Sequence, residues 1–167
     1  MKNSVAAIII IVVLVLSFFG GYYYTVNSIK NQSSTAQSKN QTAQINYVSV
    51  IDDLNNIVKI KEPVNRIVSL APSCTEIAFS IGLGKDVVGD TVYDTFPQGA
   101  VNITKVGGLT NVSVEKVLSL NPNLVLAYGG IYDPNAITQI ENAGIPVLFM
   151  NPENLDGIIH DIFMLGY

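Results

Sequence analysis

The sequence is poor in the residues that build disulfides, metal centres and heavily charged surfaces. Among 167 residues there is one cysteine and one histidine, and 13% of the residues are charged. A single cysteine excludes a disulfide within the chain. One histidine and one cysteine cannot supply the nitrogen and sulfur ligands of a zinc site. We therefore expect neither a resident metal ion nor a cofactor.

Charge is also unevenly distributed along the chain. All 13 acidic residues follow position 46, together with six of the nine basic ones, which gives residues 47–167 a net charge of −7. The first 46 residues carry +3. An acidic, aromatic-poor region offers nucleic acid no surface to bind. The glycines at 82, 84, 107 and 108 lack the spacing and the lysine of a phosphate-binding loop, so a nucleotide site is a weak alternative.

The first 26 residues contain almost no charge. Residues 5–19 form an apolar run, and residues 20–26 extend it to the roughly 20 residues needed to cross a bilayer. Phe18 and Phe19 stand where a signal peptidase needs small residues, so the pattern favours an uncleaved membrane anchor over a signal peptide. No cysteine follows the run, so a lipoprotein attachment has no acceptor. The expected location is the cell membrane, single-pass with an extracytoplasmic domain, or secretion if the segment is cleaved.

A polar tract at residues 27–46 follows, with almost nothing to bury, and predicts a flexible tether. Asn31 and Asn40 in this tract fit the N-glycosylation pattern, as do Asn102 and Asn111 farther along. An asparagine in an ordinary turn is the alternative for the last two.

Residues 66–84 organise the rest of the chain. The β-branched apolar run at 66–70 predicts a buried strand, which Pro72 ends. Ser73 stands three residues before Glu76, the spacing of a capping box, and predicts a helix that starts at Ser73. Gly82 ends that helix and turns the chain into a second strand at 87–89. This succession is one βαβ unit.

Short strands and helices alternate through the remainder. The pattern predicts a hairpin within 47–60, helices at 114–120, 134–143 and 155–163, and strands at 124–127 and 146–150. Ser113 is the expected cap of the helix at 114–120. This alternation predicts one α/β domain over residues 47–167, with a parallel sheet and helices on both faces.

Three motifs carry a resemblance to a known family: RIVSLAPS at 66–73, Thr75-Glu76, and GLG at 82–84. Together they resemble the opening signature of the periplasmic binding proteins that serve vitamin B12 and iron-complex importers. The resemblance implies a Rossmann-like amino-terminal lobe of a helical-backbone binding protein, preceded here by a transmembrane helix. In that family a long helix then crosses to a second lobe, which we expect to be absent from residues 47–167.

Three predicted strand ends point to one rim. Pro72, Ser73 and Cys74 follow the first strand, Tyr93 the second and Tyr128 the third. Aromatic rings on such a rim suit a large flat ligand such as a corrin, a haem or an aryl siderophore. The resemblance places Tyr93 and Tyr128 where the first lobe presents rings to its ligand, and Leu109 where those proteins often carry another ring. Ordinary loop aromatics are the alternative.

Glu115 has a separate interpretation. The resemblance implies that a glutamate at this position docks into an arginine pocket on the membrane permease. Composition alone describes a surface carboxylate in the first turn of a helix, where the helix dipole favours negative charge.

The resemblance therefore implies a non-enzymatic, extracytoplasmic solute-binding component of an ABC importer that captures cobalamin, haem or an iron siderophore for a permease. A tethered single-lobe sensory or adhesion module is the alternative.

A cysteine hydrolase is a third hypothesis, because a helix amino end lowers the pKa of a thiol such as Cys74. The alternative for Cys74 is a small residue packed under the capping turn. The only histidine, His160, is far away in sequence. Asp90, Asp94 and Asp133 are either a shallow cation site or solvated loop carboxylates.

Overall fold

The computed structural model describes residues 20–25 and 46–166, which belong to two compact units, Met1–Gln44 and Ile45–Tyr167. In the first unit residues 20–25 are helical. No helix among these described residues has the length and apolar character needed to span a bilayer. Most of the predicted anchor at 1–26 and of the tether at 27–46, including Asn31 and Asn40, lies outside the described residues.

The second unit is built on a five-stranded parallel sheet with the order β5-β4-β3-β6-β7. Its strands are β3 (Ile67–Ser69), β4 (Val87–Asp90), β5 (Thr104–Lys105), β6 (Leu124–Tyr128) and β7 (Val147–Met150). A separate antiparallel hairpin precedes it, formed by β1 (Tyr47–Ile51) and β2 (Ile57–Lys61). The hairpin and the parallel sheet were both predicted from the sequence, and both predictions are confirmed.

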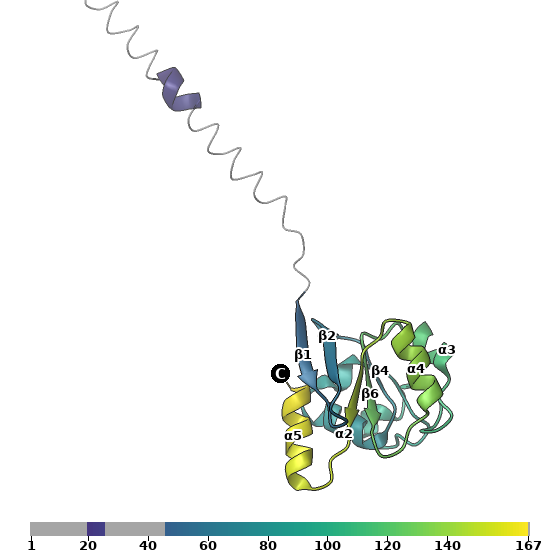
Figure 1. Ribbon diagram of the computed structural model, residues 1–167. Helices are drawn as coiled ribbons and strands as arrows, with labels where there is room; N and C mark the ends of the chain where they lie inside the picture. Colours follow the sequence, from purple (N-terminus) through teal and green to yellow (C-terminus); the bar gives the residue numbers. More distant parts are fainter. Residues whose placement is uncertain (1–19, 26–45, 167) are drawn as a thin grey trace, which may run out of the picture. The chain divides into compact units, whose positions relative to one another are not determined.

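Helices cover both faces of the sheet, as predicted (Figure 1). They are α2 (Pro72–Ser80), α3 (Val114–Ser119), α4 (Pro134–Asn142) and α5 (Leu155–Leu165), with the 3₁₀ turns η1 (Leu83–Asp86) and η2 (Gln98–Ala100). Alternate residues of each strand point to opposite faces. Ile67 thus packs with α2 and α5, whereas Val68 packs with α3 and α4.

The hairpin adds its own apolar residues to the α2–α5 side of the core. Val58 and Ile60 of β2 are buried there. The turn between β1 and β2 is held by Asp52, whose carboxylate accepts hydrogen bonds from the backbone N–H groups of Leu54, at 3.0 Å, and Asn56, at 2.8 Å. Asp53 N–H donates to the carbonyl of Phe149 at 3.2 Å, which attaches this turn to β7.

The predicted start of the first long helix is wrong by one residue. Helix α2 begins at Pro72, its N-cap is Ala71, and no side chain caps it, so Ser73 and Glu76 form no capping box. Proline is favoured at the first helical position because its φ is already helical and its missing N–H would have no partner there. Pro72 therefore starts the helix that the sequence pattern assigned to Ser73.

Gly82 ends this helix segment in the left-handed region, with φ of +88°, and turns the chain into η1. A Cβ at this position would meet no atom within 4 Å, so only the backbone conformation opposes a side chain.

We expect Gly82→Ala to lower the free energy of unfolding by about 1 kcal/mol, because alanine disfavours positive φ. Urea unfolding of the full chain measures this difference. Ser80→Ala, at the exposed end of α2, should stay within about 0.5 kcal/mol of the wild type. Equal stability of Gly82→Ala and wild type would contradict the left-handed backbone conformation of Gly82.

Candidate ligand-binding site

The sheet order places a topological switch between β3 and β6. From β3 the chain continues to β4 and β5 on one side, and then returns to β6 and β7 on the other. In open α/β sheets ligands bind at the carboxyl ends of the strands beside such a switch, where the connections leave in opposite directions. At this edge Ser69 ends β3 and Tyr128 ends β6, and Leu70 N–H donates to the carbonyl of Leu126 at 2.8 Å.

The turn after β3 presents two of its three predicted site residues toward solvent. Pro72 is half-buried and Ser73 is exposed. Cys74 has 0% exposure and belongs to the core beneath α2, which disagrees with its predicted ligand-binding role and agrees with the alternative of a small residue packed under the turn. Burial raises the pKa of the Cys74 thiol to about 12, and a hydrogen bond with Ser73 only partly opposes this. A neutral, buried thiol neither contacts a rim ligand nor acts as a nucleophile.

Tyr93 lies in the loop after β4 and keeps 57% of its surface exposed. Its ring lies against Gly108, where an added Cβ would be 3.2 Å from Tyr93 Cε2. The structure therefore brings the loop that carries Tyr93 together with the loop of residues 107–112.

Leu109, from the loop after β5, and Tyr128, at the end of β6, pack against one hydrophobic cluster. Both are partly buried against the cluster that includes Ala71. The Tyr128 ring lies over Gly130, since a Cβ there would be 2.7 Å from the ring carbons Cε1 and Cζ. Tyr128 thus has one covered side and stays partly open to solvent.

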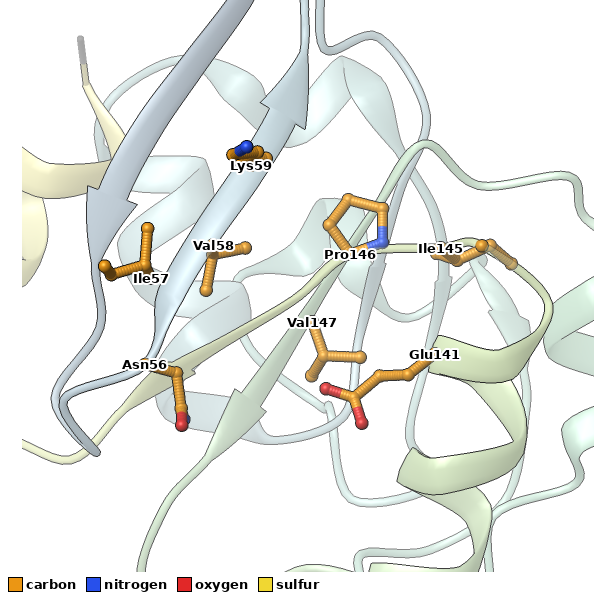
Figure 2. Close-up of a pocket in the computed structure, with 9 residues that line it drawn as sticks. Asn56, Ile57, Val58, Lys59, Glu141, Ile145, Pro146 and Val147 are labelled. Carbon is orange, nitrogen blue, oxygen red and sulfur yellow. The ribbon is translucent and has the colours of Figure 1, made fainter.

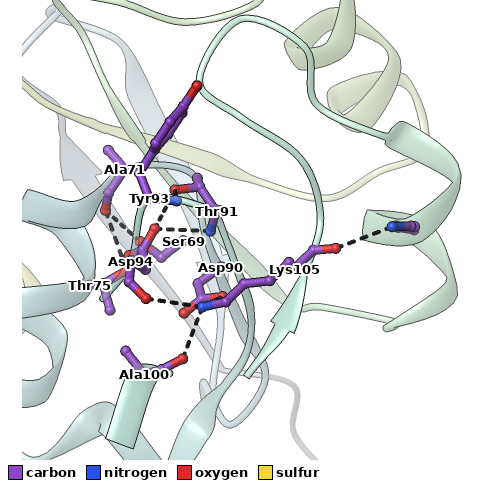
Figure 3. Close-up of polar contacts among 10 residues, drawn as sticks. Ser69, Ala71, Thr75, Asp90, Thr91, Tyr93, Asp94, Ala100 and Lys105 are labelled. Carbon is purple, nitrogen blue, oxygen red and sulfur yellow. Dashed lines mark hydrogen bonds and ion pairs between the residues drawn. The ribbon is translucent and has the colours of Figure 1, made fainter. Parts of the chain in front are cut away.

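A buried polar network holds the Tyr93 loop in place. The Asp94 carboxylate accepts hydrogen bonds from the Thr91 hydroxyl and, at 3.0 Å, from Thr91 N–H. The Thr91 hydroxyl oxygen in turn accepts from Tyr93 N–H at 3.2 Å. Figure 3 shows the Tyr93 ring directed away from this network. The network therefore fixes the backbone of Tyr93, and the ring takes no part in it.

Lys105 completes this network from β5. Its Nζ lies 2.8 Å from Asp90 Oδ1 and donates to the carbonyls of Asp94 and Ala100 at 3.1 and 3.0 Å (Figure 3). Burial raises the pKa of Asp90 to about 6, and Lys105 opposes part of that shift.

The prediction of solvated loop carboxylates is wrong for Asp90 and Asp94, which are 0% and 1% exposed. Asp133 instead caps α4, where its carboxylate accepts from Asn135 and Ala136 N–H. Within residues 20–25 and 46–166, no cluster of three or more histidine, cysteine or acidic side chains could hold a metal ion.

Asp161 is a buried carboxyl group that the sequence reasoning did not select. It is 0% exposed on α5. Burial, together with the charge of Asp53 beside it, raises the pKa of Asp161 to about 7. The sequence spacing could have indicated that Asp161 is buried, because position 161 lies four residues before the buried Leu165 and therefore on the same helix face. Its neighbour His160 is exposed.

The raised pKa of Asp161 predicts a pH dependence of stability. Between about pH 4 and pH 7 the folded chain holds a proton that the unfolded chain releases, so this contribution is lost as the pH rises toward 7. We expect Asp161→Asn to be more stable than wild type at pH 8 and to flatten the decline near pH 7. Asp156→Asn, an exposed change on the same helix, should keep the wild-type profile in thermal unfolding from pH 4 to pH 8. An unchanged profile for Asp161→Asn would contradict the buried carboxyl pair.

Glu115 is exposed in the first turn of α3, after Ser113, whose hydroxyl accepts from Lys116 N–H at 3.4 Å. The predicted cap by Ser113 is confirmed. Asn102 and Asn111 are both exposed. The Asn111 carboxamide oxygen accepts from Gly108 N–H at 3.0 Å, which is the contact of a turn asparagine. Their glycosylation stays a prediction.

Comparison with known proteins identifies the family. The family model described as "Periplasmic binding protein" matches residues 67–166. An ABC transporter substrate-binding lipoprotein of Bacillus subtilis, YvrC, is 42% identical over 75% of this chain and 41% of its own length. The crystal structure of the periplasmic vitamin B12-binding protein BtuF of Vibrio cholerae superposes with a TM-score of 0.60 at 32% identity, over 62% of this chain and 41% of that one.

A heme-binding protein, HmuT, gives a TM-score of 0.61 at 28% identity, over 75% of this chain and 43% of that one. The chain therefore belongs to the periplasmic binding protein family, and it spans about two fifths of the length of these relatives. The relatives are binding proteins, not enzymes. Nothing in these similarities favours the adhesion or sensory alternative.

Proposed function

We propose that this chain is the ligand-capturing lobe of an extracytoplasmic solute-binding protein for an ABC importer, and that its ligand is cobalamin, haem or a ferric siderophore. The observation that carries this proposal is the pair of accessible tyrosines, Tyr93 and Tyr128, at the strand ends around the switch between β3 and β6. Similar proteins named for vitamin B12 and heme binding support this ligand class.

The rim offers a large planar ligand two kinds of contact. Exposed ring faces attract flat conjugated molecules by burial and by stacking. The Tyr93 loop is already held by Thr91 and Asp94, so little conformational entropy is lost when a ligand binds. A ligand held against one lobe would leave about half its surface in water. We therefore propose that tight binding needs a second lobe that closes over the ligand.

We expect Tyr93→Ala and Tyr128→Ala each to weaken ligand binding about tenfold, because each removes a stacking contact and the burial that goes with it. The measurement is titration of the protein with cobalamin, haemin and a ferric siderophore, followed by the change in the visible absorbance of each ligand. The protein should be the full chain joined after Tyr167 to the second lobe of the Bacillus subtilis relative.

Tyr47→Ala provides the matched control. Tyr47 is 61% exposed on the hairpin strand β1, so its loss should leave affinity unchanged. If none of the three ligands binds the two-lobed protein, or if Tyr47→Ala weakens binding as much as the rim variants, the proposed function is wrong.

We also propose that Glu115 contacts the permease. Its exposure and its place in the first turn of α3 leave the carboxylate available to an arginine pocket on a partner. The helix itself begins after the β5 loop, on the same edge of the sheet as the rim.

Glu115→Arg should reduce ligand uptake by cells at least tenfold while ligand affinity stays at the wild-type value, because the change affects docking alone. Uptake of radiolabelled ligand and equilibrium titration measure the two quantities separately. Glu153→Arg, an exposed charge reversal before α5, should leave both intact. Normal uptake with Glu115→Arg would remove this residue from the docking surface.

A further inference from the structure

A groove of about 360 Å³ opens between the hairpin and the outer strand of the parallel sheet (Figure 2). One wall is formed by residues 56–59 of the hairpin, and the other by Glu141 and residues 144–147. We call it the edge groove. It lies apart from the aromatic rim, because it opens beside the amino end of β7, whereas the rim lies at the carboxyl ends of the strands.

The hairpin wall exposes the backbone of β2. Asp52 bonds to Asn56 and Asn46 bonds to Glu62 across the hairpin, so the even-numbered residues of β2 direct their N–H and C=O groups toward β1. Ile57 and Lys59 alternate with these even-numbered residues, so their backbone N–H and C=O groups point away from β1 and toward the groove. No hydrogen bond within the described part of the chain uses these groups.

The opposite wall exposes the backbone of β7. Pro146 and Met150 accept bonds from β6, so Val147 and Phe149 direct their backbone groups away from the sheet. Phe149 uses both of its groups, donating to the Asp52 carboxylate and accepting from Asp53 N–H. Val147 is 3% exposed and, among residues 46–166, no partner takes its N–H or its C=O.

The hairpin turn shows that this edge of β7 accepts main-chain bonds. Asp53 already bonds to Phe149 as the first residue of an added strand would. At Val147, two residues before Phe149 on β7, β2 no longer lies against β7, and the edge groove occupies the space between the two strands (Figure 2). A peptide strand beside Val147 would give hydrogen-bond partners to backbone groups that have none within residues 46–166.

We propose that the edge groove binds an extended peptide segment of a partner protein as an added β-strand. Only an extended polypeptide presents alternating donors and acceptors along both of its edges, which matches unpaired backbone groups on both walls. The apolar side chains of Ile57 and Ile145 line the groove and suit the alternate side chains of such a strand.

Charge favours a basic peptide. The Glu141 carboxylate turns into the groove in Figure 2, and the domain as a whole is acidic, with 13 acidic and six basic residues after position 46. A lysine or arginine on the α4 side of the peptide would pair with Glu141, on the wall opposite Lys59. Two copies of this chain paired antiparallel through β2 and centred on Lys59 would bring two lysines opposite each other, which disfavours that pairing.

The test is selection of random seven-residue peptides, displayed on phage, on the purified full chain, followed by fluorescence anisotropy with the enriched peptides. We expect peptides that alternate β-branched residues and contain at least one lysine or arginine. Lys59→Pro removes one groove-facing N–H, and Glu141→Lys reverses the charge, so each should weaken binding at least tenfold. N-methylation of alternate peptide amides should weaken binding in either register, because alternate N–H groups of the added strand bond to opposite walls of the groove.

Matched controls lie on the same molecule. Ser49→Pro removes an N–H on the far edge of β1, and Glu153→Lys reverses an exposed charge outside the groove, so both should bind like wild type. No peptide enrichment would overturn the proposal, as would binding that survives Lys59→Pro. Sedimentation that shows a dimer lost in Lys59→Pro would overturn it in favour of a second copy.

Discussion

Strand β3 bonds to β4 along one edge and to β6 along the other, and its two sides face different helix layers. Because Ile67 is buried on one side and Val68 on the other, neither face of this strand can be left uncovered. The same double pairing makes the chain reverse direction at β3. The switch point, the turn at Pro72 and the ring of Tyr128 all occupy their places because of that reversal.

Buried acidic groups define the second physical theme of this domain. Asp90, Asp94 and Asp161 are almost completely shielded from water, and burying a carboxyl group is favourable only when it is paired, hydrogen-bonded or protonated. Asp90 has Lys105, Asp94 has Thr91, and Asp161 has Asp53 with a raised pKa. Asp90 and Asp94 connect β4, β5 and the Tyr93 loop, so they act on the rim through its geometry.

The domain has two proposed binding surfaces that differ in chemistry. The rim presents Tyr93 and Tyr128 and suits a flat ligand, whereas the edge groove presents the main chain of β2 and β7 and suits a peptide. They lie at different parts of the sheet, since one follows the carboxyl strand ends and the other lines an outer edge. A change in one is therefore expected to leave the other intact.

The sequence by itself determined the order of the four helices and of every strand except the two-residue β5, because β-branched runs, caps such as Ser113 and the stop at Gly82 are local signals. It also indicated the family, through the motif at 66–73. It could not place Asp90 or Asp94 in the interior, nor pair Asp53 with Asp161, because those positions depend on loops and helices distant in sequence. Only the tertiary structure decided which strand edges stay unpaired. Hydrogen-bond partners of a strand are set by the strands that come to lie beside it, and no local pattern at Val147 or Lys59 contains that information.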